Sequence, residues 1–119
     1  MHKYSKYNYV SSGEKRTNST EYEALDGFPY PGKTEEAIPV SFRMRAMIQE
    51  GAANASIRIF DVDNGEVICE KTDVSLNEYG MIDLGAIDNL PDEEAYFEVQ
   101  AKSGTSGKYV YVTNVVYAL

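Results

Sequence analysis

The 119 residues carry 11 Lys and Arg against 19 Asp and Glu, which gives a formal net charge of −8, and 43% of them are hydrophobic. This acidic balance opposes binding to nucleic acid or anionic lipid, and no apolar run approaches the roughly 20 residues that a membrane span requires. With one His, one Cys and no Trp, few of the usual catalytic and metal-binding side chains are present, so we expect a non-enzymatic protein without a cofactor or metal. The first residues lack the apolar segment that a signal peptidase recognises, so we expect no signal peptide.

Residues 1–37 are predicted to form an extended N-terminal arm, because they show almost no apolar alternation. The first 20 residues contain four basic side chains and one acid, and the arm holds five of the ten tyrosines. Disordered tails are usually poor in aromatic residues, whereas aromatic anchors dominate protein interfaces. We therefore predict that the arm binds a partner, the alternative being an arm that lies over its own domain. The predicted partner-binding residues are Lys3, Tyr4, Lys6, Tyr7, Tyr9, Lys15, Arg16, Tyr22, Phe28 and Tyr30.

From residue 38 onwards, apolar residues recur with a period of two, which predicts β-strands. The first spans about residues 38–48, with Arg43 and Arg45 facing outward. The pair Asn64-Gly65 favours a tight hairpin turn. The last strand is apolar on both faces, as is typical of a central strand. Further strands are expected near residues 55–60, 67–69, 74–76, 81–84, 95–102 and 108–119.

Six to eight short strands and no helical segment predict an all-β fold, an antiparallel β-sandwich that we expect to be a jelly-roll. Two pairings are expected within it. The opening strand, 38–48, is predicted to lie beside the final one, and strands 95–102 and 108–119 to form a hairpin. The predicted organisation is thus an arm over residues 1–37 and a β-sandwich domain over residues 38–119.

Two groups of acidic residues are candidate cation sites. Asp61 and Asp63 alternate before a glycine, as in calcium loops, but Gly65 and Glu66 stand where an EF-hand has Asp or Asn and then Gly. A hairpin turn with solvated acids is the favoured interpretation. The second group occupies one polar loop, and we expect it to be solvated and to keep strand edges apart. Its members are Asp88, Asp92, Glu93 and Glu94.

Five tyrosines on or near the predicted strands have two interpretations. Their rings can form a platform for sugars on one face of a sheet, or they can pack at the edge of the sandwich with their hydroxyls in water, which we favour. Cys69 has no histidine in its neighbourhood and is expected to be a small core residue. The five tyrosines are Tyr79, Tyr96, Tyr109, Tyr111 and Tyr117.

The succession of four segments, residues 42–46, 55–60, 83–85 and 96–102, followed by a Val-rich strand, resembles small jelly-roll modules of tailed-bacteriophage virions. These are head decoration (cement) proteins and fibre-associated domains, and the similarity covers about residues 38–119. It implies a protein of the virion that clamps a capsid lattice, with the major capsid protein and further copies of itself as partners. Carbohydrate-binding modules share much of the pattern, and the alternative is such a module, using Tyr109, Tyr111 and Tyr117 with a structural calcium near Asp61 and Asp63.

Overall fold

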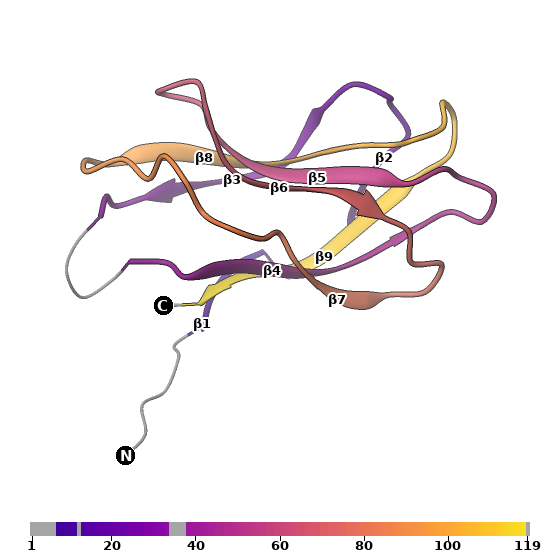
Figure 1. Ribbon diagram of the computed structural model, residues 1–119, viewed down its shortest axis with the longest axis horizontal. Coiled ribbons are helices and arrows are strands. Elements are labelled where there is room, and N and C mark those ends of the chain that lie inside the picture. Colours follow the sequence, from indigo (N-terminus) through magenta and orange to yellow (C-terminus); the bar gives the residue numbers. More distant parts are fainter. Residues whose placement is uncertain (1–6, 12, 34–37, 119) are drawn as a thin grey trace, which may run out of the picture.

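The computed structural model describes residues 7–11, 13–33 and 38–118, with the backbone alone described for residues 7–11. These residues form nine strands and no helix, so no helix in them could cross a membrane. The strands make two sheets packed face to face (Figure 1), which confirms the predicted β-sandwich. They are β1 (Tyr7–Ser11), β2 (Lys15–Thr17), β3 (Glu23–Tyr30), β4 (Ser41–Ile48), β5 (Ala55–Asp61), β6 (Glu66–Val74), β7 (Gly80–Asp83), β8 (Ala95–Lys102) and β9 (Val110–Ala118).

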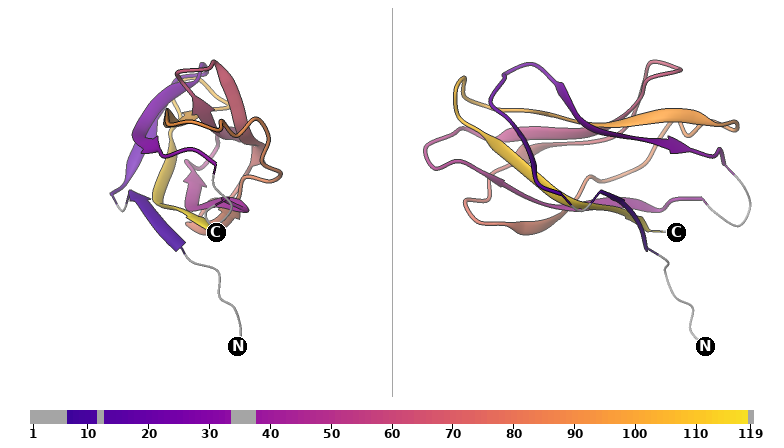
Figure 2. Two further views of the ribbon diagram at one scale, coloured as in Figure 1. Left: turned by 90° about the vertical axis from the view of Figure 1, so that its left-hand side faces the viewer. Right: turned by 180° about the vertical axis from the view of Figure 1, so that it is seen from behind.

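The order of the strands is that of a jelly-roll, as predicted. One sheet has the order β1-β9-β4-β7, with β2 also paired to β9, and the other has the order β3-β8-β5-β6. Strands β1 and β2 lie one after the other along the same edge of β9, since β1 pairs with residues 115–118 and β2 with residues 110–112. All neighbours are antiparallel, and most connections pass from one sheet to the other, as the two further views in Figure 2 show.

One of the two expected pairings is confirmed and the other is wrong. Strand β4 lies beside β9 as predicted, with Phe42 opposite Tyr117. Strands β8 and β9, in contrast, belong to different sheets, so residues 103–109 carry the chain across the sandwich instead of closing a hairpin. Both sides of β8 are already occupied, by β3 and β5. The sequence could not show this, because a short polar loop connects strands equally well within a sheet or between sheets.

The described part of residues 1–37 differs from the predicted arm, because it contributes strands to both sheets. Strand β3 pairs along its length with β8, and Phe28 and Tyr30 are buried in the core, with exposed fractions of 8% and 1%. Asp26, Gly27 and Pro29 hide this strand from a search for alternation. Pro29 is tolerated because β3 is the edge of its sheet, where one row of N–H groups has no partner strand.

The core lies between the sheets and follows the predicted alternation in β4, β5 and β8. Phe42, Ile57, Ile59 and Phe97 are fully buried. Cys69 is buried as expected, and this burial raises the pKa of its thiol to about 12. A thiol with such a pKa is almost entirely protonated at neutral pH and is a poor nucleophile.

A bulge in β9 reverses its two faces. Asn114 has a φ of 54°, and the pairing with β4 slips between Arg43 and Arg45. Beyond the bulge, Val115 and Tyr117 face the core. The Tyr117 ring lies 5.6 Å from that of Phe42, centroid to centroid. Tyr117 therefore faces the core, whereas Tyr109 and Tyr111 lie on the outer face. An uninterrupted period of two would have placed all three on one face.

Candidate functional site

The Asp61–Gly65 segment is a hairpin turn held together by its own side chains. Asp61 is fully buried, and its two carboxylate oxygens accept hydrogen bonds from the backbone N–H and the side-chain amide of Asn64, at 3.1 and 2.6 Å. Asp63 accepts the N–H of Tyr96 at 2.9 Å. Gly65 provides the positive φ of 68° that the turn requires. The predicted hairpin turn is present, and Asp63 is exposed as expected. Asp61 is not solvated, however, because it is buried and bonded to Asn64 within the turn.

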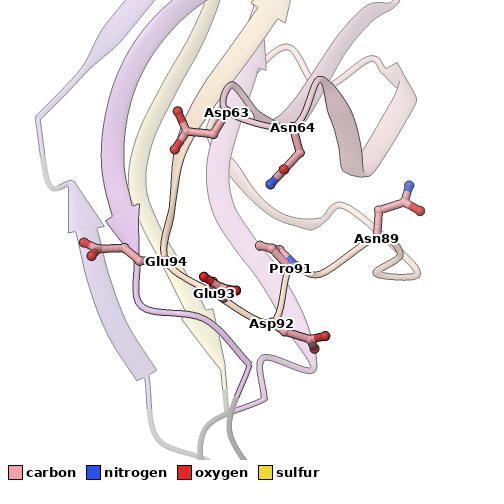
Figure 3. A pocket seen from close by; sticks show the side chains of 7 residues that line it. All are labelled: Asp63, Asn64, Asn89, Pro91, Asp92, Glu93 and Glu94. Atoms are coloured by element: carbon pink, nitrogen blue, oxygen red, sulfur yellow. The ribbon is translucent and has the colours of Figure 1, made fainter.

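The acidic loop lines a hollow of about 470 Å³ beside this turn. Figure 3 shows Asp63 and Asn64 above it and the loop, with Glu93 and Glu94, below. Asp92 pairs with Lys33 at 3.4 Å; the Asp92 side chain lies largely in solvent, and that of Lys33 is 42% exposed. Across the described residues, no group of three or more His, Cys, Asp and Glu side chains is arranged to hold a metal ion.

The predicted partner-binding residues whose side chains the structure describes do not form one surface. Lys3, Tyr4 and Lys6 lie outside the described residues, and only the backbone of Tyr7 and Tyr9 is described, in β1. Phe28 and Tyr30 are core residues whose rings contact Phe97, at centroid distances of 5.8 and 4.7 Å. Lys15 approaches Asp26 at 3.8 Å. Tyr22 and Arg16 lie on the surface, on opposite faces of the sandwich.

The outer face of the five-stranded sheet gathers arginine, tyrosine and methionine side chains from four segments. Antiparallel pairing places Arg16 of β2 and Met47 of β4 on either side of Tyr111, and places Met81 of β7 beside Arg45. Met81 is 63% exposed. This surface is called the arginine–tyrosine face below; it consists of Arg16, Arg45, Met47, Tyr79, Met81, Tyr109 and Tyr111.

The arginines of the face rest on tyrosine rings. The guanidinium carbon of Arg16 lies 4.3 Å from the ring centroid of Tyr109, and that of Arg45 lies 5.7 Å from the ring centroid of Tyr79. The rings of Tyr109 and Tyr111 are neighbours, with centroids 6.0 Å apart. Cation–π contacts of this kind position a guanidinium while leaving its N–H groups free to donate hydrogen bonds.

Tyr79 reaches across the face. It precedes β7 at one side of the sheet, and its hydroxyl donates a hydrogen bond to Glu14 at the other side, with an oxygen–oxygen distance of 2.5 Å. Burial and the bond to Glu14 raise the pKa of the Tyr79 hydroxyl above its usual value of 10. Tyr79 and Glu14 thus link the two edges of the sheet over its outer surface.

Arg16 and Arg45 have no carboxylate partner among the described residues. The ion pairs found in that part of the chain involve the cations of Lys15, Lys33, Arg43 and Lys71. The two arginines of the face are exposed. Each therefore presents a charged, planar set of donors to the surroundings, and this geometry matches a carboxylate.

The outer face of the four-stranded sheet has similar residue types, but they are bonded to one another. The guanidinium carbon of Arg58 lies 3.9 Å from the Tyr22 ring centroid and 4.7 Å from that of Phe60. Its Nε donates to Gln100 at 2.8 Å, and the Tyr22 hydroxyl donates to Glu70. This group, Tyr22, Arg58, Phe60, Glu70 and Gln100, is called the Arg58 cluster below.

The tyrosines proposed as a sugar platform are divided among three places. Tyr79, Tyr109 and Tyr111 belong to the arginine–tyrosine face, Tyr117 faces the core, and Tyr96 lies over Gly27 in the four-stranded sheet. Sequence reasoning did not include Arg16, Met47 and Met81 with the tyrosines. The period-two pattern of residues 41–48 puts Arg45 and Met47 on one outward face and could have indicated part of the set.

The comparisons with known proteins give no relative from which a site could be transferred. No protein-family model matches the chain, and no curated protein matches it either. Function is therefore inferred from the chemistry of the described surfaces.

Proposed function

We propose that this protein is a non-enzymatic assembly protein that binds a neighbouring protein subunit through the arginine–tyrosine face. The observation that carries the proposal is that Arg, Tyr and Met side chains gather on this outer surface, beside Glu14 and the Arg43–Asp83 ion pair. Aromatic residues, Met and Arg are the types enriched at the centres of protein interfaces, and Tyr and Arg are frequent energetic hot spots. The resemblance to phage decoration modules suggests a capsid lattice as the setting, with the major capsid protein as a partner.

The partner that fits this face presents carboxylates. Arg16 and Arg45 have no anionic partner within the described chain and are positioned by the rings of Tyr109 and Tyr79. A guanidinium that is already oriented loses less side-chain entropy when it forms a bidentate pair. The rings and the methionines would supply the apolar contact around those pairs.

Site-specific photo-crosslinking tests the proposal. A photoreactive amino acid replaces Met81, on the face, and in a matched variant it replaces Thr72, an exposed residue on β6 of the other sheet. In the protein's native cell, we expect position 81 to give a crosslinked protein that position 72 does not give. Adding Arg16→Ala and Tyr111→Ala to the Met81 probe should abolish the product. A product that survives these two changes, or no product above the Thr72 control, would refute the proposal.

Carbohydrate binding is the second candidate, and the adjacent rings of Tyr109 and Tyr111 favour it. Two neighbouring aromatic rings on an outward face can stack on the apolar faces of sugars. Retardation of the full chain in gels that contain polysaccharides is the measurement. Binding to sugars predicts retardation that Tyr111→Ala removes and Arg45→Ala leaves intact, whereas binding to a carboxylate-bearing protein predicts no retardation by neutral polysaccharides.

A further inference from the structure

The charges of the molecule are unevenly distributed along the chain. Residues 81–101 contain six acids and no Lys or Arg. Three of the acids, Asp92, Glu93 and Glu94, stand in the loop before β8 and line the hollow shown in Figure 3. Asp92 pairs with Lys33, whereas Glu93 and Glu94 are exposed and have no ion-pair partner within the part of the chain that the structure describes.

The loop and the arginine end of the face lie at opposite ends of the sandwich. The loop precedes Ala95, which pairs with Tyr30 at the end of β3. Arg16 lies at the other end, where β9 begins, because its neighbour Thr17 pairs with Val110. In Figure 1 the start of β8 and the start of β9 appear at opposite ends of the long axis. One copy can therefore use both surfaces at the same time without one blocking the other.

We propose that the arginine–tyrosine face binds a second copy of this chain, and that the acidic loop of the second copy, with Glu93 and Glu94, pairs with Arg16 and Arg45 of the first. This deepens the proposed function, on which it rests, by naming the partner. The charge complementarity is internal to the chain: two arginines without carboxylate partners at one surface and two glutamates without cationic partners at another. Because the two surfaces differ, the contact is head to tail and produces rings or open chains instead of closed dimers.

Light scattering of two matched variants tests this inference. The face variant, Arg16→Gln with Arg45→Gln, loses the cations, and the loop variant, Glu93→Gln with Glu94→Gln, loses the anions. We expect the native chain to increase in mean mass with concentration, and each variant alone to keep the mass of a single chain. When the variants are mixed, each retains one working surface, so the mixture should form a one-to-one dimer and nothing larger.

A control separates this contact from a general effect of charge. Glu21→Gln with Glu50→Gln removes the same number of exposed acids at the other end of the molecule, and it should assemble like the native chain. Circular dichroism of all variants verifies that the fold is retained. A native chain that stays monomeric at every concentration, or a mixture that forms no dimer, overturns the inference. A crosslink from Met81 to a different protein, together with a monomeric native chain, would leave the proposed function standing and reject self-association alone.

Discussion

The outer faces of the two sheets carry the same residue types, but these residues differ in how far they are bonded to one another. Arg58 on the four-stranded sheet lies within 4.7 Å of two aromatic rings and donates a hydrogen bond to Gln100 at 2.8 Å. Arg45 on the five-stranded sheet approaches one ring and has no carboxylate partner among the described residues. The first arrangement completes its bonds within the fold, whereas the second leaves a guanidinium without an ion-pair partner in the described chain.

The difference has a local cause in the chain. Tyr22 lies in the segment that leads into the edge strand β3, and it covers Arg58 and donates to Glu70 across the sheet. Among the described residues of the five-stranded sheet, Tyr79 and Glu14 form a comparable link between the two edges, and this link leaves Met81 63% exposed. Residue composition alone therefore does not identify a binding face; what matters is whether the polar groups have partners within the chain.

The largest difference between the faces should appear on truncation of their arginines. Arg58→Ala and Arg45→Ala make the same chemical change on central strands, so costs intrinsic to alanine in a strand cancel. Arg58→Ala loses a hydrogen bond and two ring contacts and should lower the free energy of unfolding by about 2 kcal/mol. Arg45→Ala should lower it by no more than about 0.5 kcal/mol. Urea unfolding of both variants is the measurement, and equal losses would remove the distinction between the faces.

Tyr30, which was predicted to bind a partner, is a core residue. Its hydroxyl is buried and has no hydrogen-bond partner within the described residues, and burial, together with the nearby Tyr117, raises its pKa. A buried hydroxyl without a partner costs about 1–3 kcal/mol, so Tyr30→Phe should raise the free energy of unfolding by about 1 kcal/mol. Tyr117→Phe, with a partly exposed ring, is the control and should change it by less than about 0.5 kcal/mol. A loss of stability in Tyr30→Phe would show that the hydroxyl has a partner after all.

Much of the fold could be predicted because it depends on local alternation. The buried residues of β4, β5 and β8, such as Phe42, Ile59 and Phe97, recur at every second position. Strand β3 was missed because its fold is decided by non-local pairing with β8, which tolerates Pro29 at an edge. The bulge at Asn114 was missed because one inserted residue moves Tyr117 to the other face without any change in composition.

The candidate site was only partly accessible to sequence reasoning. Arg45 was expected to face outward, and the pairing of β4 with β9 that brings it close to Tyr109 and Tyr111 was also expected. For the two tyrosines, packing at the edge of the sandwich was favoured over an outward platform. Arg16 was predicted to bind a partner as part of the arm, but it could not be placed on this face, because a strand of three residues has no measurable period. Whether Arg16 and Arg45 form ion pairs with carboxylates of the same chain depends on the tertiary structure and cannot be predicted from the sequence pattern.

The smallest expected difference between the two outer faces concerns one tyrosine–glutamate hydrogen bond on each face. Burial, reinforced by Glu70 and Glu14 respectively, raises the pKa of Tyr22 and Tyr79 above the usual value of 10. The unfolded chain therefore ionises first, so this stabilisation is complete below about pH 10 and is lost as pH rises toward the higher pKa of the folded state. Tyr22→Phe and Tyr79→Phe should each make the alkaline fall in unfolding free energy shallower, measured by urea unfolding on either side of about pH 10. Because only Tyr79 belongs to the arginine–tyrosine face, Tyr79→Phe alone should change the yield of the Met81 crosslink; an equal change in Tyr22→Phe would mean that both faces take part in binding.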